Sequence, residues 1–424
     1  MADEIAPESQ LPRNVEPLLH ETLADTPITV LQGARQVGKT TLVEKVVAFR
    51  GGVLYNLDEA ATLEAARRDP DGFVRQPVDG VLALDEVQRA PELIRAAKAA
   101  VDADRRPGRF LFTGSSDLLH VSGAEESLAG RAETVPLYGL SQGEVRGTVE
   151  DFVAATCGEG APDSSEPLDR ADYARIVCAG SYPEALARQE SRRRERWYEN
   201  YLRRVLEHDA TESSRLIHVD RLKTLIGILA AEGIGELVKA RLSRASDIPE
   251  TSLPPYLRLL EDLGLVHRIP AWRRNRTQRV VGRPECALLD TGLASHLAGL
   301  GPESLSRVAG RDHLGGLLEA FVAGELRRQQ GWSRESFEIH HYRERDGHEV
   351  DLVCELRDGR LIGIEVKSAR SASSRDFRGL ERLRARAGEA FVAGVVLHTG
   401  PSTLPFGPGL WSSPISALWT SGQG

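Results

Sequence analysis

The octapeptide GARQVGKT at residues 33–40 is the stretch of sequence with the clearest chemical meaning. It has the spacing GxxxxGK[ST], with an apolar run at 28–31 before it and a helical pattern at 39–49 after it. Glycines let a backbone wrap around phosphate groups, and amides at the start of a helix point their positive ends at them. The spacing and its context therefore predict a nucleotide phosphate site between a strand and a helix.

The lysine and the threonine of this loop have distinct expected roles. Lys39 reaches the β- and γ-phosphates of ATP, and Thr40 is a ligand of Mg²⁺. Only six of the 54 basic residues are lysines, and a planar guanidinium cannot replace a compact ammonium. The residues that we expect to bind ATP and its Mg²⁺ at this loop are Gly33, Arg35, Gly38, Lys39, Thr40 and Thr41.

Two carboxylates follow an apolar run at 81–84. The sequence VLALDE places Asp85 and Glu86 at the end of a buried strand, beside the phosphate loop. We expect Asp85 to bind Mg²⁺, directly or through water, and Glu86 to polarise the water that attacks ATP. Acids are also common at the start of helices, but next to a phosphate loop the pair favours catalysis.

The following predicted strand, at 109–112, runs into TGSS. Thr113 and Ser115 are equally suited to contact the γ-phosphate or the attacking water, whereas a helix cap explains Ser116. Arg131, in SLAGR, is a candidate arginine finger that one subunit supplies to the nucleotide of another. That role predicts a homo-oligomer, and the alternative is a solvated arginine.

A second constellation lies near the C-terminus, where Asp351, Glu365 and Lys367 match the PD-(D/E)xK nuclease pattern. Asp351 and Glu365 can share Mg²⁺ or Mn²⁺, because hard cations prefer oxygen ligands. Lys367 lies on the same strand face as Glu365 and can polarise water or stabilise charge on a phosphate. Glu319, on a preceding helix, resembles the additional acid of this pattern. The alternative is a solvated strand of alternating charge.

The strands that carry these residues can pair in two registers across residues 357–359. A two-residue turn pairs 357 with 360 and mixes charges into the apolar face. A three-residue loop with Gly359 in the left-handed conformation pairs 356 with 360. That second pairing places Asp351 across from Glu365, with Lys367 beside it, and sets Val350, Leu352 and Cys354 against Val366, Ile364 and Ile362. We expect the second register because it alone buries an apolar face.

Between the two constellations, residues 235–268 have the pattern of a helix, a turn, a second helix and an extended exit, which predicts a winged-helix-like module. The stretch at 268–283 contains no acid and offers Trp272 for stacking. Its arginines, which predict contact with DNA or RNA phosphates, are Arg268, Arg273, Arg274, Arg276, Arg279 and Arg283. The second helix carries Arg258 against Glu261 and Asp262, so we expect no base readout. Packing against the other domains is the alternative.

The elements that must position these residues follow from the apolar runs. Runs at 28–31, 53–57, 81–84 and 110–112, separated by helical stretches, predict buried parallel strands in an α/β layer structure. A loop-like stretch covers 157–168. We therefore predict a disordered N-terminus (1–14), a P-loop ATPase domain (15–150), a helical region with the winged-helix-like module (170–300) and a nuclease-like α/β domain (305–424).

Composition limits the remaining possibilities. The 424 residues carry a net charge of −8, so contact with nucleic acid must come from local patches. No apolar run approaches the ~20 residues of a membrane-spanning helix, and the polar, acidic N-terminus is not a secretory signal. The four cysteines are too far apart for a zinc site and are typical of reduced thiols, so we expect a cytoplasmic protein without a membrane partner.

Several segments together resemble one family. GARQVGKTTL, LDEVQRAPEL, FLFTGSSDLL, SLAGR, GSYPEAL and LLDTGLASHLAG, in this order, are similar to prokaryotic AAA-type ATPases with a C-terminal domain of unknown function. The resemblance spans about residues 13–400 and implies an ATPase module, a helical winged-helix-like region and a restriction-endonuclease-like domain. Ser181 replaces a glycine usual in that family. His208-Asp209 replaces Arg-Asp, which weighs against an arginine supplied from that helix to a neighbour's nucleotide.

Two functions of different classes follow. The first is an ATP-hydrolysing AAA-type protein that acts on nucleic acid through a winged helix and a metal-dependent nuclease-like domain. The alternative is a nucleotide-regulated binding or scaffold protein whose nuclease-like domain binds without cleaving. The complete set of Asp351, Glu365 and Lys367 favours the enzyme, and the net charge of −8 favours the binding protein.

Overall fold

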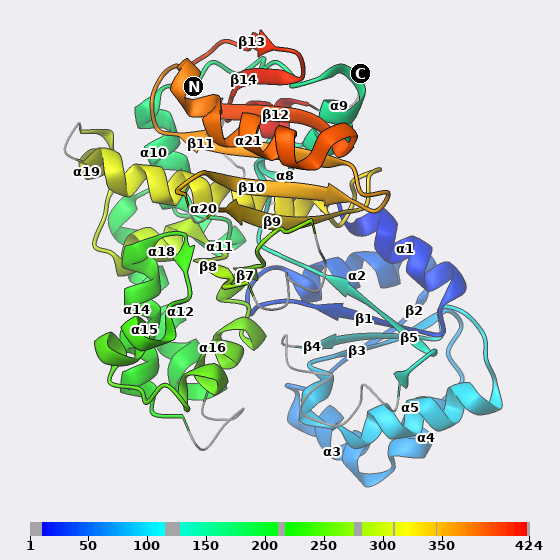
Figure 1. The fold of residues 1–424 in the computed structure, drawn as a ribbon. Helices are drawn as coiled ribbons and strands as arrows, with labels where there is room; N and C mark the ends of the chain where they lie inside the picture. The colour runs from blue at the N-terminus through cyan, green and yellow to red at the C-terminus, as the bar shows by residue number, and fades with distance from the viewer. Residues whose placement is uncertain are drawn as a thin grey trace.

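Five parallel strands form the sheet that carries the phosphate loop (Figure 1). The computed structural model describes residues 11–114, 128–210, 217–274, 282–307, 310–344 and 346–421. The strands, in the order β2-β3-β4-β1-β5, are β1 (Ile28–Gln32), β2 (Gly52–Asn56), β3 (Val81–Asp85), β4 (Phe110–Gly114) and β5 (Ala132–Pro136). The four predicted strands are confirmed, and β5 is an addition.

The three central strands, β3, β4 and β1, are almost entirely buried because helices cover both faces of the sheet. Ile28 and Val30 pack on one face with Leu93, whereas Leu31 packs on the other with Leu42. Figure 1 shows α1 and α2 on one side and the remaining helices of this part on the other. The helices are α1 (Glu16–Asp25), α2 (Lys39–Arg50), α3 (Ala60–Arg68), α4 (Pro70–Arg75) and α5 (Glu92–Ala103).

The middle of the chain is mostly helical and contains a small antiparallel sheet of order β6-β8-β7. Around that sheet lie α14 (Val219–Glu232), β6 (Gly235–Glu236), α15 (Lys239–Ser246), α16 (Leu253–Asp262), β7 (Val266–Ile269) and β8 (Glu285–Leu288). The other helices are α8 (Gln142–Arg146), α9 (Phe152–Glu159), α10 (Arg170–Ala179), α11 (Pro183–Leu186), α12 (Ser191–Arg204), α18 (Thr291–Leu297) and α19 (Pro302–Ser306).

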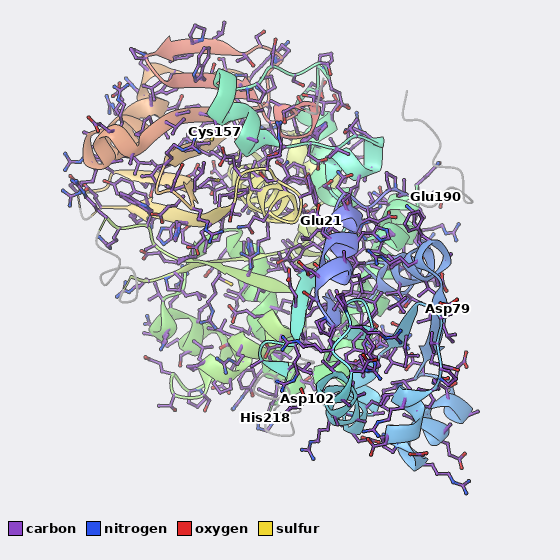
Figure 2. All side chains as sticks on the ribbon, turned by 90° about the vertical axis from the view of Figure 1, so that its right-hand side faces the viewer. Glu21, Asp79, Asp102, Cys157, Glu190 and His218 are labelled. Atoms are coloured by element: carbon purple, nitrogen blue, oxygen red, sulfur yellow. The ribbon has the colours of Figure 1, made fainter. Side chains whose placement is uncertain are left out.

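The predicted loop at 157–168 begins too early. Residues 157–159 belong to α9, whose first turn is capped because Asp151 accepts a hydrogen bond from the amide of Ala154 at 3.2 Å. Figure 2 shows Cys157, on this helix, next to the C-terminal strands. All four cysteines are free thiols.

The C-terminal part is a mixed six-stranded sheet of order β13-β14-β12-β11-β10-β9. The strands β9, β10 and β11 are antiparallel to one another. Helix α21 then connects β11 to β12, which runs parallel to β11. Its elements are α20 (Arg311–Gln329), β9 (Phe337–Arg343), β10 (Glu349–Leu356), β11 (Leu361–Lys367), α21 (Arg378–Ala387), β12 (Phe391–His398), β13 (Leu404–Gly407), β14 (Leu410–Pro414) and α22 (Ala417–Thr420).

The β10–β11 hairpin adopts the three-residue-loop register. Gly359 has φ 88°, and the amide of Leu356 donates to the carbonyl of Arg360 at 2.8 Å. Leu352 pairs with Ile364, as expected. Val350 departs from the expectation: a bulge between Val350 and Val353 turns it toward the cluster that includes Val353 and helix α21.

The N-terminal prediction is wrong for residues 11–14, while residues 1–10 lie outside the described residues. Asn14 is buried, and its Nδ2 donates to Glu150 Oε2 at 2.9 Å. The hydrogen-bond partner of Asn14 is more than a hundred residues away in the sequence, so the local sequence could not reveal that this segment is ordered. Within the described ranges, no helix combines the length and the apolar character needed to cross a membrane.

Candidate functional site

The phosphate loop connects the end of β1 to the start of α2, and two of its glycines are required by geometry. Gly38 caps α2 with φ 95°, a backbone region that residues with a Cβ rarely adopt. Gly33 packs against the carbonyl of Leu137, which would lie 2.1 Å from a Cβ at this position. Only glycine therefore fits at either end of the loop. Arg35 lies within the loop, and Thr41 is exposed on the first turn of α2.

Lys39 is buried inside the loop. Its Nζ donates to the carbonyl oxygens of Gly33 and Ala34, both at 3.0 Å. A cation enclosed by backbone dipoles is suited to exchange these carbonyl oxygens for phosphate oxygens. The predicted lysine thus lies where a phosphate-binding loop needs it.

Oxygen-bearing side chains from α2, β3 and β4 meet at the carboxyl edge of the sheet. Thr40 Oγ1 donates to Asp85 Oδ2 at 2.8 Å, and Thr113 Oγ1 donates to the other oxygen of this buried carboxylate. Thr40 and Asp85 together supply the hard oxygen donors that Mg²⁺ prefers, so the residues fit a nucleotide-bound Mg²⁺. Of the two candidates on the next strand, Thr113 contacts Asp85, and Ser115 lies outside the described residues.

Glu86 has a strained backbone, with φ 58° and ψ 44°. Left-handed conformations are uncommon for residues other than glycine and cluster at functional sites. The amide of Glu86 donates to Thr113 Oγ1 at 3.1 Å, and its carboxylate accepts a hydrogen bond from Gln88 Nε2. These contacts hold the carboxylate immediately after Asp85, where a general base for ATP hydrolysis would be needed.

Arg13 is a residue of this site that sequence reasoning missed. Its guanidinium donates to the carbonyls of Val37 and Tyr138, both at 2.7 Å, and to Glu144 Oε1 at 3.1 Å. It therefore braces the outer side of the phosphate loop. No local signal distinguishes it from the many other arginines of the chain.

Arg131 does not reach the nucleotide of its own chain. The backbone carbonyl of Arg131 accepts from the amide of Ile28 at 3.1 Å, which places it at the amino edge of the sheet, opposite the loop. Its Nε donates to Asp102 Oδ1 at 2.6 Å. Figure 2 labels Asp102 in the lower half of the molecule. A contact with the chain's own ATP is excluded, because the strand length separates the two edges.

The C-terminal residues also come together, from α20, β10 and β11. Lys367 Nζ donates to Glu365 Oε1 at 2.6 Å, and Asp351 Oδ2 accepts from the amide of Val366 at 2.7 Å. Glu365 is 7% exposed, and its Oε2 has no hydrogen-bond partner among the described residues. An unpartnered buried carboxylate oxygen is costly, and a bound cation would remove that cost.

The electrostatics of this cluster point the same way. Burial and the charge of Asp351 raise the pKa of Glu319 to about 9 and that of Glu365 to about 8. Burial lowers the pKa of Lys367, but the negative charges of Asp351 and Glu365 outweigh it and raise the pKa above its usual range. Like charges this close favour a cation between them. Across the described ranges, however, no three His, Cys, Asp or Glu side chains are already grouped so as to hold a metal ion.

Glu285 is a second residue that sequence reasoning missed. This buried acid on β8 lies 3.6 Å from His341 Nδ1 and 3.7 Å from Arg343 Nη2. Burial raises its pKa to about 7, and the charge of Asp351 adds to the rise. The one available signal is an acid at the start of an otherwise apolar strand.

The basic stretch at 268–283 differs from its prediction at two residues. Trp272 is 5% exposed and packs against Tyr342 with ring centroids 6.0 Å apart, so it cannot stack on bases. Arg268 forms an ion pair with Glu261 at 2.5 Å. Both side chains therefore make contacts within the protein itself. Arg273, Arg274 and Arg283 are exposed, and Arg276 and Arg279 lie outside the described residues.

The structure describes the side chain of Ser181 but not those of His208 and Asp209, the residues that depart from the family pattern. The amide and hydroxyl of Ser181 donate to Asp290 Oδ2 at 2.6 and 2.8 Å, which ties α11 to the start of α18. Residues 208–209 lie in a π-helical continuation of α12, and their side chains lie outside the described part of the structure.

Comparisons with known proteins assign the first part of the chain. Residues 25–146 match a family described as an AAA domain, and residues 170–304 and 314–418 match two families described as domains of unknown function, DUF8612 and DUF4143. Residues 25–146 therefore form an AAA-type P-loop ATPase domain, which confirms this part of the resemblance.

Two uncharacterized proteins, of Mycobacterium tuberculosis and Mycobacterium bovis, are each 29% identical over 369 residues, covering 86% of this chain and 76% of theirs. Among solved structures, a Walker-type ATPase of Pyrococcus abyssi is 17% identical, with a TM-score of 0.41, covering 69% of this chain and 97% of that chain. A RuvB variant of Thermotoga maritima is 16% identical, with a TM-score of 0.25, covering 61% and 90%.

Proposed function

We propose that this chain hydrolyses ATP at the phosphate loop and uses a divalent-cation centre in its C-terminal domain to act on nucleic-acid phosphodiesters. The observation that carries the second part is the meeting of Glu319, Asp351, Glu365 and Lys367, from three elements, in one partly buried cluster in which Glu365 is the buried member. The ATPase part rests on the AAA domain and on the Lys39, Thr40 and Asp85 geometry.

In ATP hydrolysis, Lys39 and the loop amides bind the β- and γ-phosphates, and Thr40 and Asp85 hold Mg²⁺. Glu86 accepts the proton of the attacking water as oxygen bonds to the γ-phosphorus and the bond to the β–γ bridging oxygen breaks. Thr113 fixes both the Asp85 carboxylate and the Glu86 amide. The strained Glu86 backbone supports this assignment, because strain persists where a side chain must be held.

At the C-terminal centre, Asp351 and Glu365 would hold Mg²⁺ or Mn²⁺. Burial raises the pKa of Glu319, which lies close enough that the charges of these two carboxylates raise it further. A bound cation polarises a phosphoryl oxygen. Lys367, whose ammonium lies 2.6 Å from Glu365 Oε1, would stabilise the negative charge that develops on the phosphate.

The middle region supports an approach of nucleic acid to this centre. The order α14, β6, α15, α16, β7, β8 with a three-stranded sheet supports a winged helix, and the proposed wing is the segment between β7 and β8, of which residues 270–274 and 282–284 are described. The amide of Trp272 donates to the carbonyl of His341 at 2.6 Å, so the wing starts beside β9. The exposed Arg273, Arg274 and Arg283 would contact phosphates without reading bases.

A second function has two specific observations in its favour. Lys367 is paired directly with Glu365, and no metal-ready group of three donors exists in the described ranges. These facts fit a nucleotide-regulated protein whose C-terminal domain binds nucleic acid without cleaving it.

One experiment separates the two. The full chain is incubated with ATP, Mg²⁺ or Mn²⁺, and DNA or RNA of several forms, beside the Asp351→Asn variant. The first function requires cleavage by the parent, loss of cleavage in Asp351→Asn, and equal ATP turnover by both at saturating ATP. Binding without cleavage by the parent would establish the alternative, and neither binding nor cleavage would refute both.

A further inference from the structure

The β7–β8 hairpin is short enough to link the two candidate centres rigidly. Its pairs run from Val266 with Leu288 to Ile269 with Glu285. A strand rises about 3.3 Å per residue, so roughly 10 Å separates the first pair from the last. The two ends of this hairpin contact different parts of the molecule.

The first end touches the phosphate loop. Gly264, just before β7, has φ +67°, and a Cβ at this position would lie 2.9 Å from Ala34 Cβ and 3.3 Å from the Ala34 nitrogen. The amide of Leu289 donates to the carbonyl of Leu265 at 3.0 Å and closes the hairpin here. A cavity of about 430 Å³ lies at this junction, lined in part by Gly33 and His267.

The second end touches the C-terminal centre. The Glu285 carboxylate lies against His341 and Arg343 of β9, and Arg343 Nη2 also pairs with Glu349 Oε2 at 2.8 Å. Glu349 lies two residues before Asp351 on β10. The amide of His341 donates to the carbonyl of Pro270 at 3.0 Å, so the chain leaving the hairpin is bonded to β9.

Helix α20 is a second element that extends from the C-terminal centre toward the phosphate loop. Glu319 lies in the C-terminal cluster, and nine residues later Arg328 Nε donates to the carbonyl of Gly139 at 3.0 Å and Nη2 to that of Leu289 at 3.3 Å. Leu137, two residues before Gly139, packs its carbonyl on Gly33 of the loop. The hairpin is therefore clamped between the loop and α20.

A phosphate at the loop would disturb this arrangement. Lys39 donates to the carbonyls of Gly33 and Ala34, and an ammonium that turns toward a phosphate must give up at least one of these bonds. Ala34 is the residue on which Gly264 packs. We propose that nucleotide binding at the phosphate loop and cation binding at the C-terminal centre are coupled, and that the β7–β8 hairpin carries the coupling.

This coupling rests on the cation centre put forward as part of the proposed function, and it is reciprocal by thermodynamic necessity. The test titrates Mn²⁺ into the full chain, with and without a saturating non-hydrolysable ATP analogue, while electron paramagnetic resonance measures free Mn²⁺. Lys39→Ala with the same analogue corrects for Mn²⁺ held by free nucleotide. Asp351→Asn identifies the Mn²⁺ bound at the C-terminal centre.

The analogue should change the dissociation constant of that Mn²⁺ at least fivefold in the parent, since such couplings are typically about 5- to 150-fold. In Gly264→Ala and Glu285→Gln the change should fall below about twofold, although each ligand still binds alone. Gly299→Ala is the matched control, because Gly299 has φ +66° with no atom within 4 Å of an added Cβ. It carries the same backbone strain and should keep the parental coupling.

Thermal melting shows whether Gly264→Ala is folded, and if it is not, the nearly isosteric Glu285→Gln decides alone. An unchanged dissociation constant in the parent overturns the coupling, and full coupling in both hairpin variants overturns the role of the hairpin. If Asp351→Asn removes no Mn²⁺, the cation centre of the proposed function is wrong, and the coupling falls with it.

Discussion

At the scale of single residues, Lys39 and Glu86 separate ATP binding from ATP turnover. Lys39→Ala removes a buried ammonium that would bond to phosphate, and charge-assisted bonds are worth about 1.5–3 kcal/mol, so ATP affinity should fall about 10- to 100-fold. Glu86→Gln should keep ATP affinity and stop hydrolysis, because an amide cannot accept the proton of water. Equilibrium binding and phosphate release measure the two effects.

Lys45→Ala is the control for Lys39→Ala, since Lys45 lies on the same helix and pairs at the surface with Glu16. It should bind and hydrolyse ATP like the parent. Hydrolysis by Glu86→Gln at the parental rate would show that another group activates the water.

Glu150 gives a residue-scale prediction about pH. Burial raises its pKa to about 8, with the charges of Glu325 and Glu144 adding to the rise. Because the folded state binds this proton more tightly than the unfolded state, the group's stabilising effect is complete below about pH 4.5 and is lost as the pH rises through about 8. Glu150→Gln should therefore be more stable than the parent at pH 9, by roughly 1–4 kcal/mol, and about equal at pH 4.

Urea unfolding at both pH values measures this difference. Glu338→Gln is the control for replacing a carboxylate that is not buried, because that side chain is 78% exposed, and it should gain no stability over the parent at pH 9. A Glu150→Gln variant that is no more stable than the parent at pH 9 would mean that burial does not raise the pKa of the Glu150 carboxyl.

At the scale of elements, the segment between β7 and β8 is the proposed interface for nucleic acid. Each phosphate contact contributes about one unit to the slope of log affinity against log salt. Replacing the exposed Arg273, Arg274 and Arg283 by alanine should lower that slope by about two to three units, and scrambled sequences should bind equally well. Fluorescence anisotropy over a salt series makes the measurement.

Replacing Arg192, Arg193 and Arg196 of α12 by alanine is the control, since these three arginines are also exposed. It tests whether the loss of any three exposed arginines lowers the slope. The slope should then stay near the parental value. Binding that does not depend on salt would remove the 268–283 stretch from the proposed interface.

At the scale of the whole molecule, Trp419 joins parts of the chain that are far apart in sequence. It is 1% exposed, its Nε1 donates to Glu166 Oε2 at 2.6 Å, and the Arg146 guanidinium lies 5.0 Å from its ring centre. Trp419→Ala should cost about 3–5 kcal/mol, as for other buried aromatic residues. Trp419→Phe keeps most of the packing and should cost less. Denaturant unfolding of both variants tests the order, and equal costs would contradict it.

The expected homo-oligomer is also a prediction at this scale. Arg131 lies at the edge of the sheet opposite its own loop, so an arginine finger at this position would have to contact the nucleotide of another subunit. Arg131→Ala should lose turnover but keep ATP binding, and mixing it with Glu86→Gln should restore part of the turnover at mixed interfaces. Arg105→Ala, which removes a bond to Gly130 at the same edge, should stay active. No recovery in the mixture would exclude an Arg131 finger.

What the sequence determined by itself is local in origin. The phosphate loop and the four apolar strands are contiguous signals, because spacing, glycine and apolar runs act over a few residues. The register of β10 and β11 was also predictable, since a short loop with Gly359 leaves few ways to pair the strands, and only one of them buries an apolar face. The positions of Lys39, Thr40 and Asp85 follow from the same local rules.

What only the tertiary structure decided is which residues far apart in the sequence contact one another. Arg13 binds Glu144, Glu285 approaches Arg343, Trp272 is buried under Tyr342, and Gly264 rests on Ala34. Each of these contacts joins residues that are tens to hundreds of positions apart. A buried polar group is stable only with a partner of matching geometry, and that partner is chosen by the packing of whole elements. The phosphate loop could be read from eight residues, but the contacts around it required the folded chain.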